Sequence, residues 1–129
     1  ELGDLLRQLG EATTGRARVP VEVQIEGTYA GMPVEVKVAL YRIAQEALNN
    51  VAKHSGAELA TVRLCRGPEQ VSLDIADDGR GFDRDTIPPD HLGVGIMRER
   101  AEAIGAELTI TTEPGQGTEV SVVWGGSGG

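Results

Sequence analysis

Three polar side chains of different chemistry follow one another at helical spacing in the segment 41–54. Glu46, Asn50 and Lys53 are four and three residues apart, so a helix places a carboxylate, an amide and an ammonium group on neighbouring turns. An amide oxygen can bind Mg2+, a carboxylate can orient a metal-bound water or accept a proton, and an ammonium group binds phosphate. The segment could therefore contribute to a site for a divalent cation and a phosphorylated ligand, if the rest of the chain supplies the remaining groups.

Three glycine-rich segments follow this predicted helix. They are Asp-Asp-Gly-Arg-Gly-Phe at 77–82, Gly-Val-Gly at 93–95 and Gly-Gln-Gly-Thr at 115–118. Gly93 and Gly95 lead directly into another predicted helix, whose free N–H groups and dipole favour an anion such as a triphosphate. Asp77 ends a predicted strand, where its carboxylate can accept a hydrogen bond from an amino group such as that of adenine. Together with the helix, these segments predict binding of Mg-ATP.

Each segment alone also has an ordinary structural explanation. Polar residues such as Glu46 and Asn50 are common on the exposed side of a helix, and Asp-Asp-Gly at 77–79 is a common turn sequence. His54 suits the end of a helix. The better-known nucleotide motifs do not occur in the sequence, which has no Gly-x4-Gly-Lys-Ser/Thr, no Gly-x-Gly-x-x-Gly and no His-Arg-Asp. The prediction therefore depends on the order and spacing of all four segments.

Composition limits the class of protein. With 129 residues and 40% hydrophobic content, the chain can form one folded domain with a core. The net charge of -8 argues against general binding of nucleic acid or of an acidic membrane. The single cysteine, Cys65, allows no internal disulfide and fits a reducing compartment such as the cytoplasm. No apolar run is long enough to cross a bilayer, so we expect no direct membrane contact.

Hydrophobic periodicity predicts an α+β fold. Helical spacing predicts helices over 1–12, 34–54 and 96–104, and alternation predicts strands over 19–26, 57–66, 71–77, 107–112 and 119–124. Residues 78–95 are rich in Gly, Pro and Asp and are expected to be irregular. Strands joined by short loops indicate a two-layer α/β sandwich, with a mixed, mostly antiparallel sheet covered on one face by helices.

We expect a single ATP-binding domain over residues 1–124. Within it, residues 1–18 are expected to be an N-terminal helix and linker from a preceding region, and residues 125–129 a flexible glycine-rich tail. Because the sequence begins with Glu1 and not with Met, we expect it to be a piece of a longer protein.

The four segments, in this order, resemble the sequence boxes of the ATP-binding catalytic domain of sensor histidine kinases. Segment 42–54 is similar to the N box, 77–82 to the G1 box, 91–100 to the G2 box with Ile96 in place of leucine, and 115–118 to the last Gly-x-Gly-Thr box. The N box is most similar to that of kinases paired with NarL/LuxR-type response regulators. The resemblance covers about residues 20–124 and implies the Bergerat fold of the GHKL superfamily.

The resemblance implies a role for each residue of the site. Asn50 would bind Mg2+, and Glu46 would act near the γ-phosphate as a base or as a group that orients water. Asp77 would bind the adenine amino group, supported by Thr118 through water. Residues 83–92 would form the lid over ATP. The nucleotide would be bound by Asn50, Lys53, His54, Asp77, Gly79, Gly81, Gly93, Val94, Gly95, Ile96 and Thr118.

The resemblance also implies the activity and the partners. The γ-phosphoryl group of Mg-ATP would pass to a histidine on a dimerisation hairpin of the same parent protein, outside this chain, and a NarL/LuxR-type response regulator would follow. His54 lies in the N box and His91 in the lid, so neither is that histidine, and the chain alone is not expected to autophosphorylate.

Two alternatives remain open: a serine kinase of the anti-sigma-factor type, from the same superfamily, and a nucleotide-sensing interaction module that transfers no phosphate. We expect no nucleic-acid partner and a cytoplasmic domain. Whether the parent protein is anchored in a membrane is left open.

Overall fold

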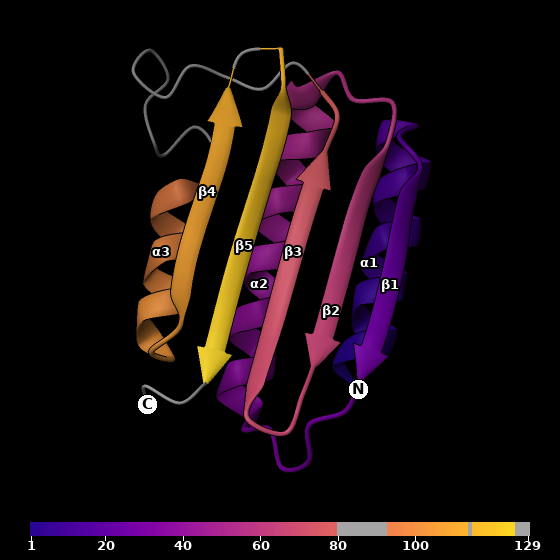
Figure 1. The fold of residues 1–129 in the computed structure, drawn as a ribbon. Coiled ribbons are helices and arrows are strands. Elements are labelled where there is room, and N and C mark those ends of the chain that lie inside the picture. Colours follow the sequence, from indigo (N-terminus) through magenta and orange to yellow (C-terminus); the bar gives the residue numbers. More distant parts are fainter. Residues whose placement is uncertain (80–92, 114, 126–129) are drawn as a thin grey trace.

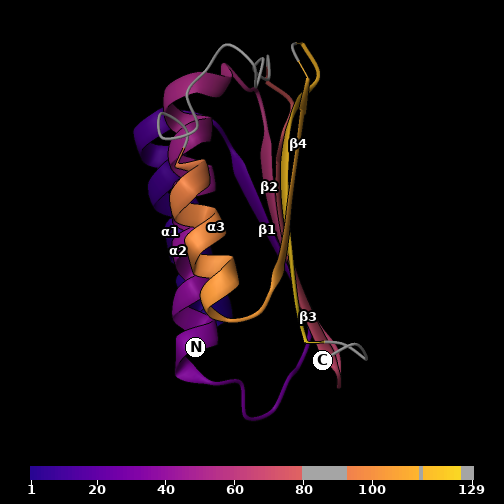
Figure 2. The ribbon, with the colours of Figure 1, turned by 90° about the vertical axis from the view of Figure 1, so that its left-hand side faces the viewer.

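The computed structural model describes residues 1–79, 93–113 and 115–125, which form a helical layer packed on one sheet (Figure 1). The elements are α1 (Leu2–Ala17), β1 (Val21–Gly27), α2 (Val34–Asn50), the π-helix η1 (Val51–Ser55), β2 (Ala60–Arg66), β3 (Gln70–Asp77), α3 (Val94–Ala103), β4 (Glu107–Glu113) and β5 (Gly117–Gly125). Figure 2 shows the sheet edge-on, with the helices on the same face of it. The predicted two-layer α+β sandwich is therefore confirmed.

The sheet has five strands in the order β1-β2-β3-β5-β4. Strands β1 and β2 are parallel, and α2 crosses over between them, because neighbouring parallel strands cannot be joined by a tight turn. The other neighbours are antiparallel. The register places Asp77 of β3 opposite Thr118 of β5, and Thr118 opposite Thr112 of β4. Residues of three neighbouring strands are thereby aligned at one end of the sheet, with Asp77 far in the sequence from the β4–β5 hairpin.

Helix α2 forms the centre of the core, and two of the predicted site residues, Glu46 and Asn50, lie along its side. Its buried residues recur every three or four positions, as expected for a helix with one apolar face: Val36, Ala39, Leu40, Ile43, Ala44, Ala47 and Leu48. Leu40 and Ile43 are fully buried, and each contributes about 1.5–3 kcal/mol of burial free energy. Glu46 and Asn50 lie at the border of this face and are half-buried. Packing of the apolar face therefore fixes their position.

Helix α1 is longer than the sequence indicated. The helix predicted over 1–12 continues to Ala17. Thr13 and Thr14 are accommodated in it, because their hydroxyl groups donate to the carbonyl oxygens of Leu9 and Gly10 at 2.9 and 3.0 Å. The helix ends at Arg18, whose φ of 60° is left-handed. Leu2 and Leu6 of α1 are buried in the same core as α2.

Two elements near the predicted site also differ from expectation. The helix predicted over 34–54 is α-helical only to Asn50 and continues as a π-helical turn to Ser55. Hydrophobic periodicity cannot distinguish a short π-helical turn from the last turn of an α-helix. Gly56, with φ 61°, ends this turn. Helix α3 begins at Val94 and not at Ile96, because Gly93 caps it with φ 66°.

Strand boundaries shift by up to three residues: β2 begins at Ala60 and β5 at Gly117. No helix among the described residues is long and apolar enough to cross a membrane.

Candidate functional site

The predicted site residues that the structure describes gather towards one end of the sandwich, drawn at the top of Figure 1, where α2 and β3 end and β5 begins. We call this the upper end. Asp77 is the last residue of β3, and Gly79 lies two residues beyond it. Thr118 comes from the start of β5 and Asn50 from the end of α2. Gly81 and residues 83–92 lie outside the described residues, so their predicted roles stay predictions.

Asp77 is a half-buried carboxylate at the last position of β3. Its Oδ1 accepts a hydrogen bond of 2.8 Å from the N–H of Gly79. Burial raises the pKa of Asp77 above its ordinary value. The N–H of Gly79 opposes this shift, the negative charge of Asp78 adds to it, and the N–H of Thr118 opposes it. An ionised carboxylate offers more acceptor positions than the N–H groups of Gly79 and Thr118 occupy, so Asp77 can also accept a hydrogen bond from a ligand.

The start of β5 is fitted closely against Asp77. Gly117 has φ 83°, and a Cβ atom built there would collide with the carbonyl oxygen of Asp77, so this position requires glycine. The hydroxyl oxygen of the next residue, Thr118, lies 3.0 Å from that of Thr112 on β4. Gln116, Gly117, Thr118 and Asp77 are among the residues that line a hollow of about 330 Å3 at this end of the sheet. The last glycine box thus shapes the surroundings of Asp77.

Glu46 and Gly93 are brought together, although they are far apart in the sequence. A Cβ atom built at Gly93 would collide with Oε2 of Glu46 and would lie 3.3 Å from its Cδ. Gly93 caps α3 in a left-handed conformation, so the carboxylate of Glu46 lies against the start of that helix. The structure therefore places the predicted N box next to the predicted G2 box, where Glu46 meets Gly93.

The other predicted residues are placed less completely. Asn50 is half-buried and has a polar interaction of its own within the chain. Lys53 is exposed on η1, while the side chain of His54 lies outside the described residues. Val94 is half-buried, and Gly95 and Ile96 are exposed in the first turn of α3. No group of three or more His, Cys, Asp or Glu side chains suited to a metal occurs among the described residues.

Two residues of the upper end were missed by sequence reasoning. Thr112 shares a face of β4 with the buried Ile110, and strand alternation together with the β4–β5 hairpin register would have placed it opposite Thr118. Asp78 binds the backbone of Glu58 and Leu59, and no sequence pattern signals that contact.

The polar groups at the upper end fit a nucleotide with a divalent cation. It combines a half-buried acceptor for an amino group, an amide oxygen on α2, and a helix N-terminus preceded by a left-handed glycine. The chemistry is suited to recognising a base at Asp77 and phosphates near Gly93 and Asn50.

Comparison with known proteins assigns most of the chain to a family model. The model described as "Histidine kinase-, DNA gyrase B-, and HSP90-like ATPase" matches residues 35–125, a span that includes every segment of the site.

Individual relatives agree with this match. The sensor histidine kinase LiaS of Bacillus subtilis (strain 168) is 34% identical over 83% of this chain and 30% of that protein. The sensor protein VraS of Staphylococcus aureus (strain COL) is 36% identical over 81% of this chain and 30% of that protein. Among solved structures, the histidine kinase domain from the Erythrobacter litoralis EL346 blue-light activated histidine kinase has a TM-score of 0.76 at 30% identity, covering 96% of this chain and 60% of that one. The chain thus spans 30% of the length of these two curated relatives.

Proposed function

The chain belongs to the family of histidine kinase-, DNA gyrase B- and HSP90-like ATPases, and we propose that it is the ATP-binding catalytic domain of a two-component sensor histidine kinase. Its homology to sensor histidine kinases and to a solved histidine kinase domain supports this choice within the family. We propose that residues 1–124 form this one domain and that it works in the cytoplasm, where ATP is available.

The observation that carries the proposal is the half-buried carboxylate of Asp77 at the strand end. Adenine presents an amino group that can donate to this acceptor, and the low dielectric of a partly buried site strengthens such a bond. Thr118 supports Asp77 through its N–H, and Gly79 does so at 2.8 Å. We assign Gly81 to the base pocket on the resemblance of the G1 box alone.

The phosphates and Mg2+ are assigned to the other half of the upper end. Gly93, Val94, Gly95 and Ile96 would offer the N-terminus of α3 to the phosphates, and Lys53 and His54 would approach them from η1. Asn50 would bind Mg2+ through its amide oxygen, and the bound ion would neutralise charge on the phosphates. Glu46 lies against Gly93 and would orient or deprotonate a group near the γ-phosphate.

The reaction that this arrangement would serve is phosphoryl transfer to a histidine of a separate hairpin. The bond between the γ-phosphorus and its bridging oxygen breaks, a bond from that phosphorus to an imidazole nitrogen forms, and ADP leaves. Such transfer depends on positioning and charge neutralisation, which glycine N–H groups, Lys53 and Asn50 can supply. The phosphoryl group would then pass to a NarL/LuxR-type response regulator, a choice supported by the sequence of the N box at 42–54.

Calorimetric titration with Mg-ATP tests the adenine assignment. Asp77→Asn should weaken binding by at least roughly 100-fold, because it puts an N–H donor opposite the amino group and removes the charge. Asp74→Asn is the matched control, since Asp74 lies on the same strand but on the other face of the sheet, and it should bind as the wild type does. Equal affinity for the wild type and a folded Asp77→Asn variant would show that the assignment is wrong.

The metal assignment is tested by repeating the titration with and without Mg2+. Asn50→Ala should remove the dependence of ATP affinity on Mg2+. The neighbouring Asn49→Ala should keep that dependence, because the Oδ1 atom of Asn49 instead accepts a hydrogen bond of 3.1 Å from Arg16. If the ATP affinity of Asn50→Ala still depends on Mg2+, another residue binds the metal.

Labelled ATP separates the remaining alternatives. With the histidine-bearing hairpin added, we expect an acid-labile phosphoryl group on the hairpin. Acid-stable label on a serine of a partner would favour the serine-kinase alternative, and binding without any transfer would favour a nucleotide-sensing module.

A further inference from the structure

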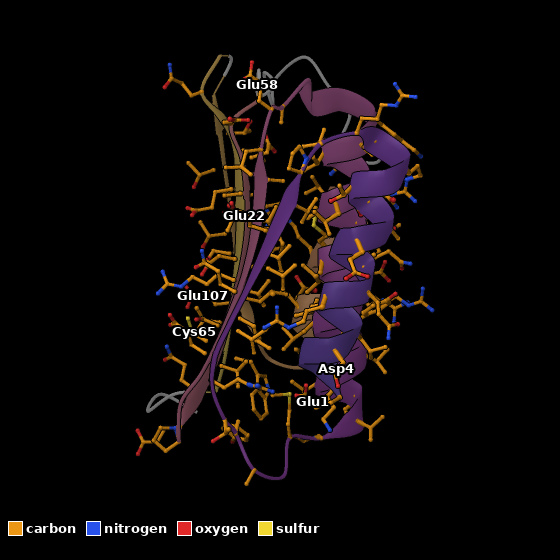
Figure 3. All side chains as sticks on the ribbon, turned by 90° about the vertical axis from the view of Figure 1, so that its right-hand side faces the viewer. Glu1, Asp4, Glu22, Glu58, Cys65 and Glu107 are labelled. Carbon is orange, nitrogen blue, oxygen red and sulfur yellow. The ribbon has the colours of Figure 1, made fainter. Side chains whose placement is uncertain are left out.

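Asp78 is exposed, yet its carboxylate makes two hydrogen bonds to backbone that lies far away in the sequence. Oδ1 accepts from the N–H of Glu58 at 2.9 Å and from the N–H of Leu59 at 3.0 Å. The backbone N–H of Asp78 in turn donates to the carbonyl oxygen of Leu59 at 3.3 Å. Three hydrogen bonds thus tie Asp78 to the segment 58–59, and Figure 3 shows Glu58 at the upper end of the molecule, opposite to Glu1.

The two segments that meet here lead to different halves of the proposed nucleotide site. Segment 58–59 follows Gly56, whose left-handed conformation ends η1, and η1 follows directly after Asn50. Asp78 itself stands between Asp77 and Gly79, the residues assigned to the base. The contact therefore joins the segment that follows η1 to the residue next to Asp77.

We propose that Asp78 is a positioning residue of the nucleotide site, an acceptor that fixes the spacing between the base end at Asp77 and the phosphate end at Asn50 and Lys53. This inference rests on the proposed function and adds a residue to it. Asp78 does not touch the nucleotide and acts through the backbone of Glu58 and Leu59.

The chemistry of the contact requires an acceptor and not a negative charge. Both partners of the carboxylate are neutral backbone N–H groups, and one oxygen atom receives both hydrogen bonds. The N–H groups of Leu59 and Glu58 hold the pKa of Asp78 below its ordinary value, so the carboxylate is available as an acceptor at neutral pH. The amide oxygen of asparagine has the same two lone pairs, whereas alanine has none.

A ligand that spans both halves should depend on the spacing more than one that fills only the base half. NMR titrations of Mg-ATP and of adenosine against the wild type, Asp78→Ala and Asp78→Asn measure this difference. We expect Asp78→Ala to weaken Mg-ATP binding by about tenfold and adenosine binding by less than about threefold, while Asp78→Asn stays within about threefold of the wild type for both ligands. Loss of stability alone would not change the ratio of the two affinities in a protein that remains folded.

Three results would overturn the proposal. They are unchanged Mg-ATP affinity in Asp78→Ala, an equal loss for Mg-ATP and adenosine, and a loss in Asp78→Asn as large as that in Asp78→Ala. If Asp78→Ala does not fold, Asp78→Asn decides, because a loss of Mg-ATP affinity in that variant contradicts the acceptor role and full retention supports it. Failure of the ATP-binding assignment itself is distinguishable, since the wild type would then not bind Mg-ATP at all, and failure of the kinase assignment appears only in the transfer experiment with the added hairpin.

Discussion

The two ends of the sandwich are built from different kinds of contact. At the upper end, Asp77 is half-buried with a raised pKa, and left-handed Gly117 brings β5 against its carbonyl oxygen. At the lower end, drawn at the bottom of Figure 1, the rings of Tyr29 and Trp124 meet edge to face with centroids 5.2 Å apart. The lower end closes the core with apolar area, whereas the upper end keeps polar groups that a stable core does not need.

The polar contacts at the two ends also differ in kind. At the lower end, Arg66 pairs with Glu1, so the start of α1 is joined to the end of β2. At the upper end, Asp78 makes hydrogen bonds to backbone N–H groups and is thereby fixed without a cation. We infer that the lower end serves stability and the upper end serves ligand binding. The predictions below test this division, from the largest expected effect to the smallest.

Gly117→Ala should have the largest effect at the upper end. Its Cβ atom would collide with the carbonyl oxygen of Asp77 at a left-handed φ, so urea denaturation should show a loss of about 3 kcal/mol. Gly115→Ala is the matched control: Gly115 has φ 80° in the same turn, but no described atom lies within 4 Å of its built Cβ, so the loss should be about 1 kcal/mol. Equal losses would show that the close approach to Asp77 is unimportant.

Trp124→Ala should weaken the lower end without touching the site. Removing this partly buried ring should lower the free energy of unfolding by about 2 kcal/mol, because its contacts with Tyr29 and the core are lost. Affinity for Mg-ATP should stay within about twofold at temperatures where the variant is folded. Val123→Ala, on the other face of β5, provides the control with a smaller loss. A large drop in affinity would mean that the two ends are not independent.

Gly95→Ala separates a structural glycine from a functional one. Gly95 lies in the first turn of α3, and a built Cβ meets no described atom within 4 Å, so the helix should gain about 0.5–1 kcal/mol. Mg-ATP affinity should fall, because the phosphates would lose their close approach to the backbone. Gly15→Ala in α1 has equally open surroundings and should raise stability while leaving affinity unchanged. If Gly95→Ala binds Mg-ATP as the wild type does, α3 is not the phosphate site.

Asp77 should also produce a small dependence of stability on pH. Burial raises its folded-state pKa above the ordinary value of 3.8, so the folded protein holds the proton to a higher pH than the unfolded chain. Stability should therefore fall as the pH rises from about 3.8 through the folded pKa, relative to Asp77→Asn, and the difference should be constant above that range. Denaturation of both proteins across this range measures it, and an opposite slope would contradict the raised pKa.

Much of the fold follows from periodicity in the sequence. The apolar residues of α2 recur at helical spacing, and the alternation of β3 and β5 places Ile75 and Val120 inside, so the two layers were predictable. Strand ends and the π-turn at 51–55 were not, because terminal hydrogen bonds and not hydrophobic pattern decide them.

The site was predictable only in part, and for a similar reason. Asp77 was recognised because it precedes glycines at a strand end. The contact between Glu46 and Gly93, and that between Asp78 and Leu59, join segments whose proximity exists only after folding. Thr112 was predictable in principle, because the correct register of β4 with β5 places it opposite Thr118.

A titration of the wild-type chain with Mg-ATP, followed through the backbone amide signals by NMR, tests the central claim most directly. We predict shifts concentrated at the upper end, around Asn50, Asp77, Gly79, Gly93 and Thr118, while the indole N–H signal of Trp124 at the lower end stays in place. Shifts centred on Tyr29 and Trp124, or none at millimolar nucleotide, would contradict the assignment of ATP binding to the upper end.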